Sequence, residues 1–159
     1  MSRTDEIVTA ARLLLQDYGW PEIPLRDIAN EIGIKAPSLY KHVSGMVEIA
    51  ALVATEGLSE YGQYLREGWE ENGATGVLVA HRDFFRENPY LYELMTSRLF
   101  PREYLPGDLL GWSREPFHWM ADNDTQLGLS YTAMAHGLAL LELRDGRIPD
   151  PQWEYVVAE

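Results

Sequence analysis

The chain has 159 residues, of which 46% are hydrophobic and 24% charged, and its formal net charge is -12. These proportions are those of an ordinary globular protein and argue against wholesale disorder. No cysteine is present, which excludes disulfide frameworks and thiolate metal sites. Charges interrupt the N-terminal stretch, so we expect no signal peptide. No run reaches 18 apolar residues, so we expect no membrane span. The expected location is the cytoplasm.

The negative charge is unevenly distributed along the chain. Residues 1–48 carry five Lys and Arg against seven Asp and Glu, a net charge of -2. The remaining residues carry eight against eighteen, a net charge of -10. A polyanion such as nucleic acid is therefore expected to contact only the first third of the chain.

The first predicted helix starts near the N-terminus. Thr4 is its expected N-cap, because a hydroxyl there can accept a backbone hydrogen bond, and an apolar stripe then runs to Leu15. Gly19 and Pro21 end this helix. The sequence therefore predicts a helix of about three turns.

The next stretch, "IPLRDIANEIGIKAPSLYKHV", has the pattern of a helix-turn-helix. A short helix is expected over 25–32, with the small Ala29 where two helices cross. Gly33 permits the positive φ of a sharp turn. A third helix is expected over 37–42, with Pro37 in its first turn. In such motifs the second helix of the pair enters the major groove of DNA.

Polar and aromatic side chains gather on this expected recognition helix. Hydroxyl, phenol and ammonium groups bind phosphates, and an arginine early in the preceding helix can reach a phosphate or a guanine edge. The alternatives are that Tyr40 packs on the first helix and that Arg26 is an ordinary exposed charge. The candidate DNA-contacting residues are Arg26, Lys35, Pro37, Ser38, Tyr40, Lys41 and His42.

Helical periodicity dominates the rest of the chain. The fourth helix is weakened by Gly57 and Gly62, and "ENGATG" marks the break after it. Further helices are expected over 46–67, 77–86, 89–99, 109–121 with an interruption at Pro116, and 125–143, followed by a short tail over 152–158. No strand-like alternation persists, so the predicted fold class is all-α.

The second segment is rich in aromatic residues and methionine. Such side chains are typical of an apolar ligand pocket, although at helical spacing they also fill a core. His136, beside Gly137, serves either close helix packing or a polar contact to a ligand. The candidate ligand-binding residues are Trp69, Phe84, Phe85, Tyr92, Met95, Trp112, Phe117, Met120, Met134 and His136.

Metal binding and catalysis find little support in the sequence. His81, His118 and His136 are widely spaced and no paired metal-ligand motif lies on one helix face. There is no nucleophile elbow, P-loop or dinucleotide fingerprint. We therefore expect no metal, no cofactor and no enzymatic activity.

From Thr4 to about Leu52 the chain resembles the tetracycline-repressor (TetR) family, above all in "G-I-x-x-P-S-L-Y-x-H-V". The resemblance implies a three-helix DNA-binding domain over 1–46 and a helical ligand-binding and dimerisation domain over 47–159. It also implies a homodimeric repressor that leaves a palindromic double-stranded operator when a small apolar effector binds. The positions that match family DNA contacts are Arg26, Pro37, Ser38, Tyr40, Lys41 and His42.

The match has departures that keep other functions open. Met46 occupies the position of the usual phosphate-binding lysine, and Pro24 replaces the usual hydroxyl cap. Near the C-terminus, "YTAMAHGLALLELRDG" resembles a Trp-His-Gly subtype of the family, but the tryptophan is missing. The alternatives are a degenerate relative that binds a ligand or partner without DNA, and a small all-α enzyme or carrier that uses the aromatic cavity.

Overall fold

The computed structural model describes residues 1–154, and every regular element in that range is helical. The all-α prediction is confirmed. No helix in the described range is both long enough and apolar enough to cross a membrane. The α-helices are α1 (Arg3–Leu15), α2 (Leu25–Glu31), α3 (Ala36–Leu39), α4 (Met46–Glu87), α5 (Pro89–Thr96), α6 (Leu109–Trp119), α7 (Thr125–Asp145) and α8 (Asp150–Glu154), with 3-10 turns at Trp20–Glu22 and Arg102–Tyr104.

The helices belong to two compact units. The first unit contains residues 1–57 and 90–107, and the second contains residues 58–89 and the chain from 108 onward. The long helix α4 therefore begins in one unit and continues in the other. The functional division at residue 46 stays a prediction, and residues 155–158 of the predicted tail lie outside the described range.

The cap of α1 differs from the prediction. Ser2, and not Thr4, is the N-cap, because the helix already begins at Arg3. The Ser2 hydroxyl accepts from the Asp5 backbone N–H at 3.1 Å, and the Asp5 carboxylate accepts from the Ser2 N–H at 2.7 Å. This reciprocal capping box satisfies two N–H groups that the first turn leaves without helical partners.

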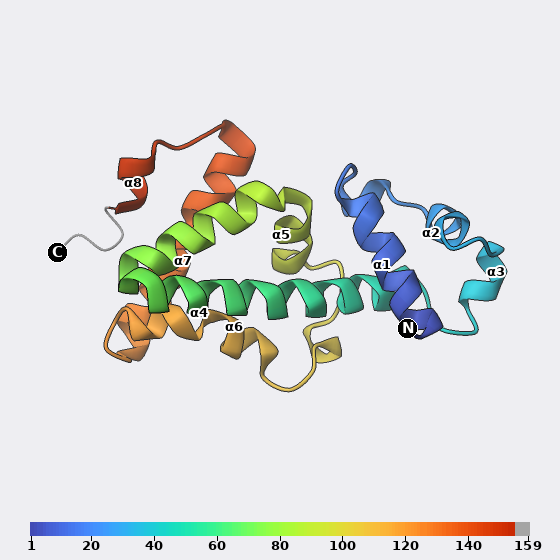
Figure 1. Cartoon of the computed structure of the whole chain (residues 1–159), viewed down its shortest axis with the longest axis horizontal. Helices are drawn as coiled ribbons and strands as arrows, with labels where there is room; N and C mark the ends of the chain where they lie inside the picture. The colour runs from blue at the N-terminus through green and yellow to red at the C-terminus, as the bar shows by residue number, and fades with distance from the viewer. Residues whose placement is uncertain (155–159) are drawn as a thin grey trace. The chain divides into compact units, whose positions relative to one another are not determined.

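Helices α1, α2 and α3 pack as a three-helix group (Figure 1). Its core consists of small and branched apolar side chains that are 0% exposed, namely Ile7, Ala11, Ile28, Ala29 and Leu39. The two alanines allow the helices to approach closely, as expected for Ala29. Burial of this kind contributes roughly 1.5–3 kcal/mol for each large side chain.

The predicted break at "ENGATG" is confirmed as a reversal inside α4. Asn72 and Gly73 leave the helical region, and Gly73 has a φ of +54°. The limb after them doubles back alongside the limb before them (Figure 1). Gly68 and Gly76 face each other across this reversal, and a Cβ added to Gly76 would overlap the Gly68 carbonyl oxygen.

The predicted interruption of α6 is wrong, because the helix continues through Pro116. Proline lacks the N–H that would bind the carbonyl of Trp112 four residues earlier. Arg66 supplies the missing donor, with its Nη2 at 2.9 Å from the Trp112 oxygen. A side chain of α4 thus satisfies the backbone group that Pro116 leaves open.

Candidate nucleic-acid interface

The turn between α2 and α3 is built by a glycine cap. Gly33 has a φ of +70°. Its N–H donates to Asn30, and the Ile34 N–H donates to Ala29 at 3.0 Å. This pair of hydrogen bonds is a Schellman motif, which closes the C-terminus of α2 and redirects the chain. The helix-turn-helix predicted around Gly33 is therefore present.

Helix α3 is shorter than predicted but keeps its expected orientation. Lys35 is the N-cap residue and Pro37 lies in the first turn. Leu39 is fully buried and anchors the helix, which packs against α2. After Leu39 the chain continues as turns, because the backbone N–H of Lys41 bonds to the carbonyl three residues earlier and not four.

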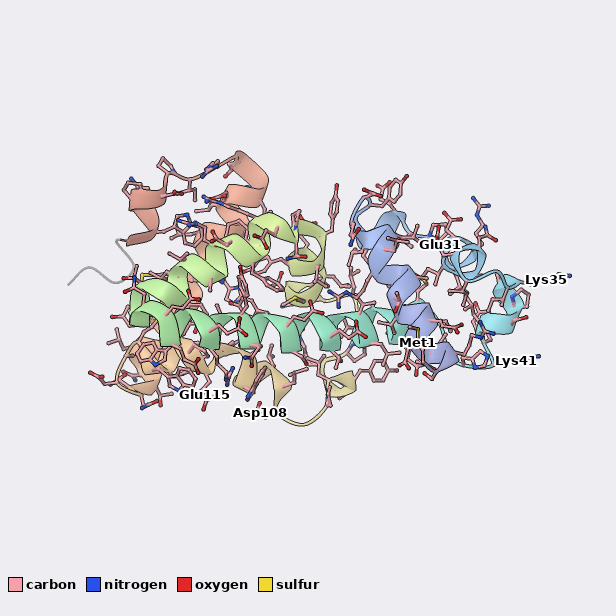
Figure 2. The ribbon with its side chains drawn as sticks, in the orientation of Figure 1. Met1, Glu31, Lys35, Lys41, Asp108 and Glu115 are labelled. Carbon is pink, nitrogen blue, oxygen red and sulfur yellow. The ribbon has the colours of Figure 1, made fainter. Side chains whose placement is uncertain are left out.

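The seven candidate DNA-contacting residues lie on the outside of this unit. Six are exposed and Ser38 is half-buried. Tyr40 is 62% exposed, so its ring does not fill the core under α1. Lys35 and Lys41 point away from the ribbon (Figure 2). Arg26 forms an ion pair with the adjacent Asp27, at 3.4 Å, and 79% of its side chain is exposed. These groups are available to a ligand, and their contact with DNA stays a prediction.

The start of α4 carries a carboxylate close to this surface. Met46 is the first residue of α4 and occupies the position where the resemblance leads one to expect a phosphate-binding lysine. The Glu48 carboxylate accepts from the Ser44 N–H at 2.5 Å. That N–H is thus occupied by a negative group of the protein itself, which reduces the attraction of this helix start for a phosphate.

The ten candidate ligand-binding residues do not share one unit. Tyr92 and Met95 belong to the first unit and the other eight to the second. Trp69, Met120 and His136 are half-buried, and Trp112 and Met134 are exposed. The buried members are Phe84, Phe85, Tyr92, Met95 and Phe117. Their role in binding an effector stays a prediction.

Several of these residues surround a buried tyrosine–histidine pair that the sequence reasoning missed. The Tyr61 hydroxyl donates to His81 Nδ1 at 2.8 Å, and His81 Nε2 donates to the Ala135 carbonyl at 3.0 Å. The rings of His136 and Phe117 lie 5.3 and 5.7 Å from that of His81. The available signal was the helical spacing of Leu58, Tyr61 and Leu65, which places Tyr61 on an apolar face.

Both histidines of this cluster are held in the neutral form. Burial lowers the pKa of His81 to about 3, helped by the neighbouring His136. Burial also lowers the pKa of His136 to about 4, and the charge of Arg114 adds to the effect. Because Nε2 of neutral His81 donates to Ala135, its Nδ1 accepts from Tyr61, and protonation of His81 would require the Tyr61 hydroxyl to turn from donor to acceptor.

We expect stability to fall as the pH drops through the range in which unfolded histidines bind protons. The contribution of the two histidines to the free energy of unfolding is fully present above pH 6.5 and is lost toward pH 4. Over this range the histidines of the unfolded chain bind protons, whereas those of the folded chain stay neutral. The free energy of unfolding should fall between pH 7.5 and pH 5, and in His136→Gln this fall should be smaller by about 1–2 kcal/mol. Urea unfolding at the two pH values measures it. His42→Gln, which removes an exposed histidine, should keep the original difference; an unchanged difference in His136→Gln contradicts the assignment.

Comparison with known proteins finds a curated sequence relative and solved structures of similar fold. No family model matches the chain. An uncharacterised HTH-type transcriptional regulator, YobS of Bacillus subtilis (strain 168), is 33% identical over 91 residues, which are 55% of this chain. The chain covers 48% of that relative, about half its length.

The structural matches cover nearly the whole chain. A TetR transcriptional regulator from Rhodococcus sp. RHA1 matches with a TM-score of 0.59 and 18% identity over 96% of this chain and 89% of that one. The TetR family repressor AlkX from Dietzia sp. strain DQ12-45-1b, implicated in biodegradation of n-alkanes, matches with a TM-score of 0.56 and 18% identity over 98% and 91%. The chain therefore has the fold of TetR-family transcriptional regulators, and the resemblance seen in its sequence is confirmed at that level.

Proposed function

We propose that this chain is a DNA-binding transcriptional regulator of the TetR type. The observation that carries the proposal is the exposed group around α3, where Tyr40, Lys41 and His42 project from a glycine-capped helix-turn-helix. The relative YobS bears the description of an HTH-type transcriptional regulator, and both structural matches are TetR regulators. Base edges and phosphates are the ligands that suit these side chains.

The regulator acts as a homodimer. Helix α7 leaves an apolar face without cover in the described chain, and a soluble monomer rarely exposes such a surface without a partner. Leu127, Met134 and Leu141 recur every seven residues and are each 44% exposed. A second copy of α7 fits a stripe with this repeat.

The regulator is a repressor, and binding of a small apolar effector releases it from its operator. The aromatic cluster around Tyr61 and His81 supports an apolar binding region in the second unit. The effector must bind the arrangement that releases DNA more tightly than the one that holds it, because equal affinity would shift nothing.

A second candidate is a TetR-like protein that has lost DNA binding and retains its ligand or partner. Met46 in place of lysine, the Glu48 carboxylate at the start of α4 and the net charge of -2 over residues 1–48 favour it. Each missing phosphate contact lowers the salt dependence of binding by roughly 0.9 in slope. The two candidates therefore differ in a measurable property.

Selection of bound sequences from a random duplex library tests the proposal. We expect an enriched pseudo-palindrome whose half-sites lie about one helical turn, or a multiple of it, apart, because a two-fold dimer presents two α3 helices. Salt titration on the selected duplex should give a steep negative slope. No enrichment at low salt contradicts DNA recognition and favours the degenerate candidate; a single half-site contradicts the dimer.

A further inference from the structure

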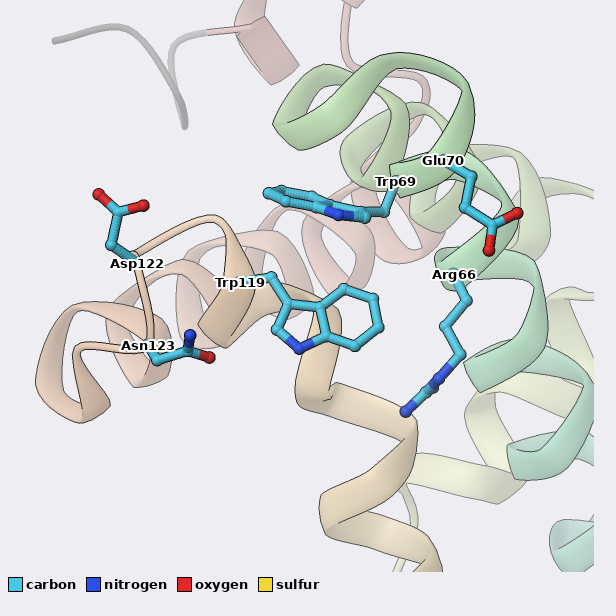
Figure 3. A pocket seen from close by; sticks show the side chains of 6 residues that line it. All are labelled: Arg66, Trp69, Glu70, Trp119, Asp122 and Asn123. Atoms are coloured by element: carbon cyan, nitrogen blue, oxygen red, sulfur yellow. The ribbon is translucent and has the colours of Figure 1, made fainter.

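A surface pocket of about 500 Å³ lies in the second unit, between α4 and the turn that joins α6 to α7. Two indole rings project into it, with Arg66 and Glu70 on one side and Asp122 and Asn123 on the other (Figure 3). The ring centroids of Trp69 and Trp119 are 5.9 Å apart at an interplanar angle of 60°. Of the ten predicted ligand-binding residues, Trp69 alone is part of this lining.

The single positively charged residue of the lining, Arg66, already interacts with other groups of the protein. Arg66 Nη2 lies 2.6 Å from the Glu115 carboxylate and also donates to the Trp112 carbonyl that Pro116 leaves open. Its guanidinium carbon lies 3.8 Å from the centre of the Trp112 ring and 5.2 Å from that of Trp119. Arg66 therefore holds the wall of the pocket together, and Glu115 compensates its charge.

The two carboxylates of the lining have no such compensation. Among the described residues, neither Glu70 nor Asp122 makes an ion pair or a side-chain hydrogen bond. Asp122 is held in the left-handed region with a φ of 49°, followed by Asn123 at 64°, in the turn between α6 and α7. The pocket thus combines two indole rings with two uncompensated negative charges.

We infer that this pocket binds an amphipathic organic cation, with its ammonium group between the indole rings and the carboxylates and its apolar part against the rings. Indole is the aromatic side chain that attracts cations best, because the face of its ring carries negative potential. Carboxylates near the rings add Coulomb attraction for a cation and repel an anion. The guanidinium of Arg66 is a cation that already lies over one of these rings, that of Trp119. The inference concerns binding alone and does not depend on DNA recognition.

Titration of the whole chain with benzyltrimethylammonium, followed by tryptophan fluorescence and calorimetry without DNA, tests the inference. Benzenesulfonate and 3-phenylpropan-1-ol serve as an anion and a neutral molecule of similar size. We expect saturable binding of the cation, at least about tenfold tighter than that of the neutral molecule and with no binding of the anion. Equal affinity for the cation and the neutral molecule, or no binding of the cation at millimolar concentration, would overturn the inference.

Variants locate the binding. Glu70→Gln/Asp122→Asn should weaken binding of the cation about fivefold to tenfold without loss of fold, because both side chains are exposed and asparagine accepts a positive φ. Glu71→Gln/Asp145→Asn removes the same charge outside the pocket and should leave the affinity within about twofold. Trp119→Leu should cost about fivefold or more. Equal losses in both charge variants would mean general attraction to an acidic protein and would overturn the site.

Discussion

Tyr40→Ala/Lys41→Ala is expected to abolish binding to the selected operator, with a loss of at least about thirtyfold, because each removed phosphate or base contact contributes about 1–3 kcal/mol. Both side chains are exposed beside α3. The residue that anchors this helix in the core is Leu39, not Tyr40. The free energy of unfolding should therefore change by less than about 0.5 kcal/mol. Fluorescence anisotropy on the selected duplex and urea unfolding measure the two quantities.

A matched variant separates specific contacts from general loss of an aromatic and a charge. Tyr18→Ala/Arg144→Ala also removes one phenol and one positive charge, from exposed positions outside the helix-turn-helix. Its operator affinity should stay within about threefold of the original chain. If Tyr40→Ala/Lys41→Ala binds the operator as tightly as this control, α3 is not the recognition helix. If both variants lose binding equally, the effect reflects net charge and not contact.

Gly76→Ala is expected to destabilise the second unit by at least about 3 kcal/mol, because the added methyl group collides with backbone and not with a movable side chain. The carbonyl of Gly68 occupies the space, and neither limb of α4 can yield without shifting the reversal at Asn72 and Gly73. The Tyr61–His81 contact joins the same two limbs, so the methyl group acts on the core as well. Urea unfolding followed by circular dichroism measures the loss.

Gly137→Ala is the control, because it adds the same methyl group to a helix at a position with no atom within 4 Å. It should be neutral or stabilise the chain by up to about 1 kcal/mol, since alanine favours helix over glycine. A Gly76→Ala variant as stable as the original chain would mean that the two limbs are not packed against each other at Gly68.

The resemblance to a TetR regulator and the arrangement of the first three helices were readable from local sequence. A helix-turn-helix is specified by neighbours: Gly33 for the turn, Pro37 for the first turn of α3 and apolar residues at helical spacing. The break at "ENGATG" was readable for the same reason. The N-cap of α1 was misplaced by two residues, because Ser2 and Thr4 are both good caps and only the start of the helix distinguishes them.

The effects of two glycines and of Pro116 depend on distant residues that the local sequence does not identify. Gly57 and Gly62 weaken a helix taken alone, but a Cβ on Gly57 would crowd Leu91, and one on Gly62 would overlap Trp112. Close packing against these neighbours offsets a low intrinsic helix propensity. Pro116 interrupts an isolated helix, whereas Arg66, fifty residues earlier in the chain, replaces its missing donor.

The sequence by itself determined the all-α class, the helix-turn-helix and the residues exposed on it, because each of these follows from contacts within a turn or two of helix. Only the tertiary structure decided which aromatic residues form the core and which line the pocket between Trp69 and Trp119. Helical periodicity identifies an apolar face but not the element that covers it. Covering depends on long-range packing, and so the pairing of Tyr61 with His81 and the uncompensated charges of Glu70 and Asp122 appear only in the folded chain.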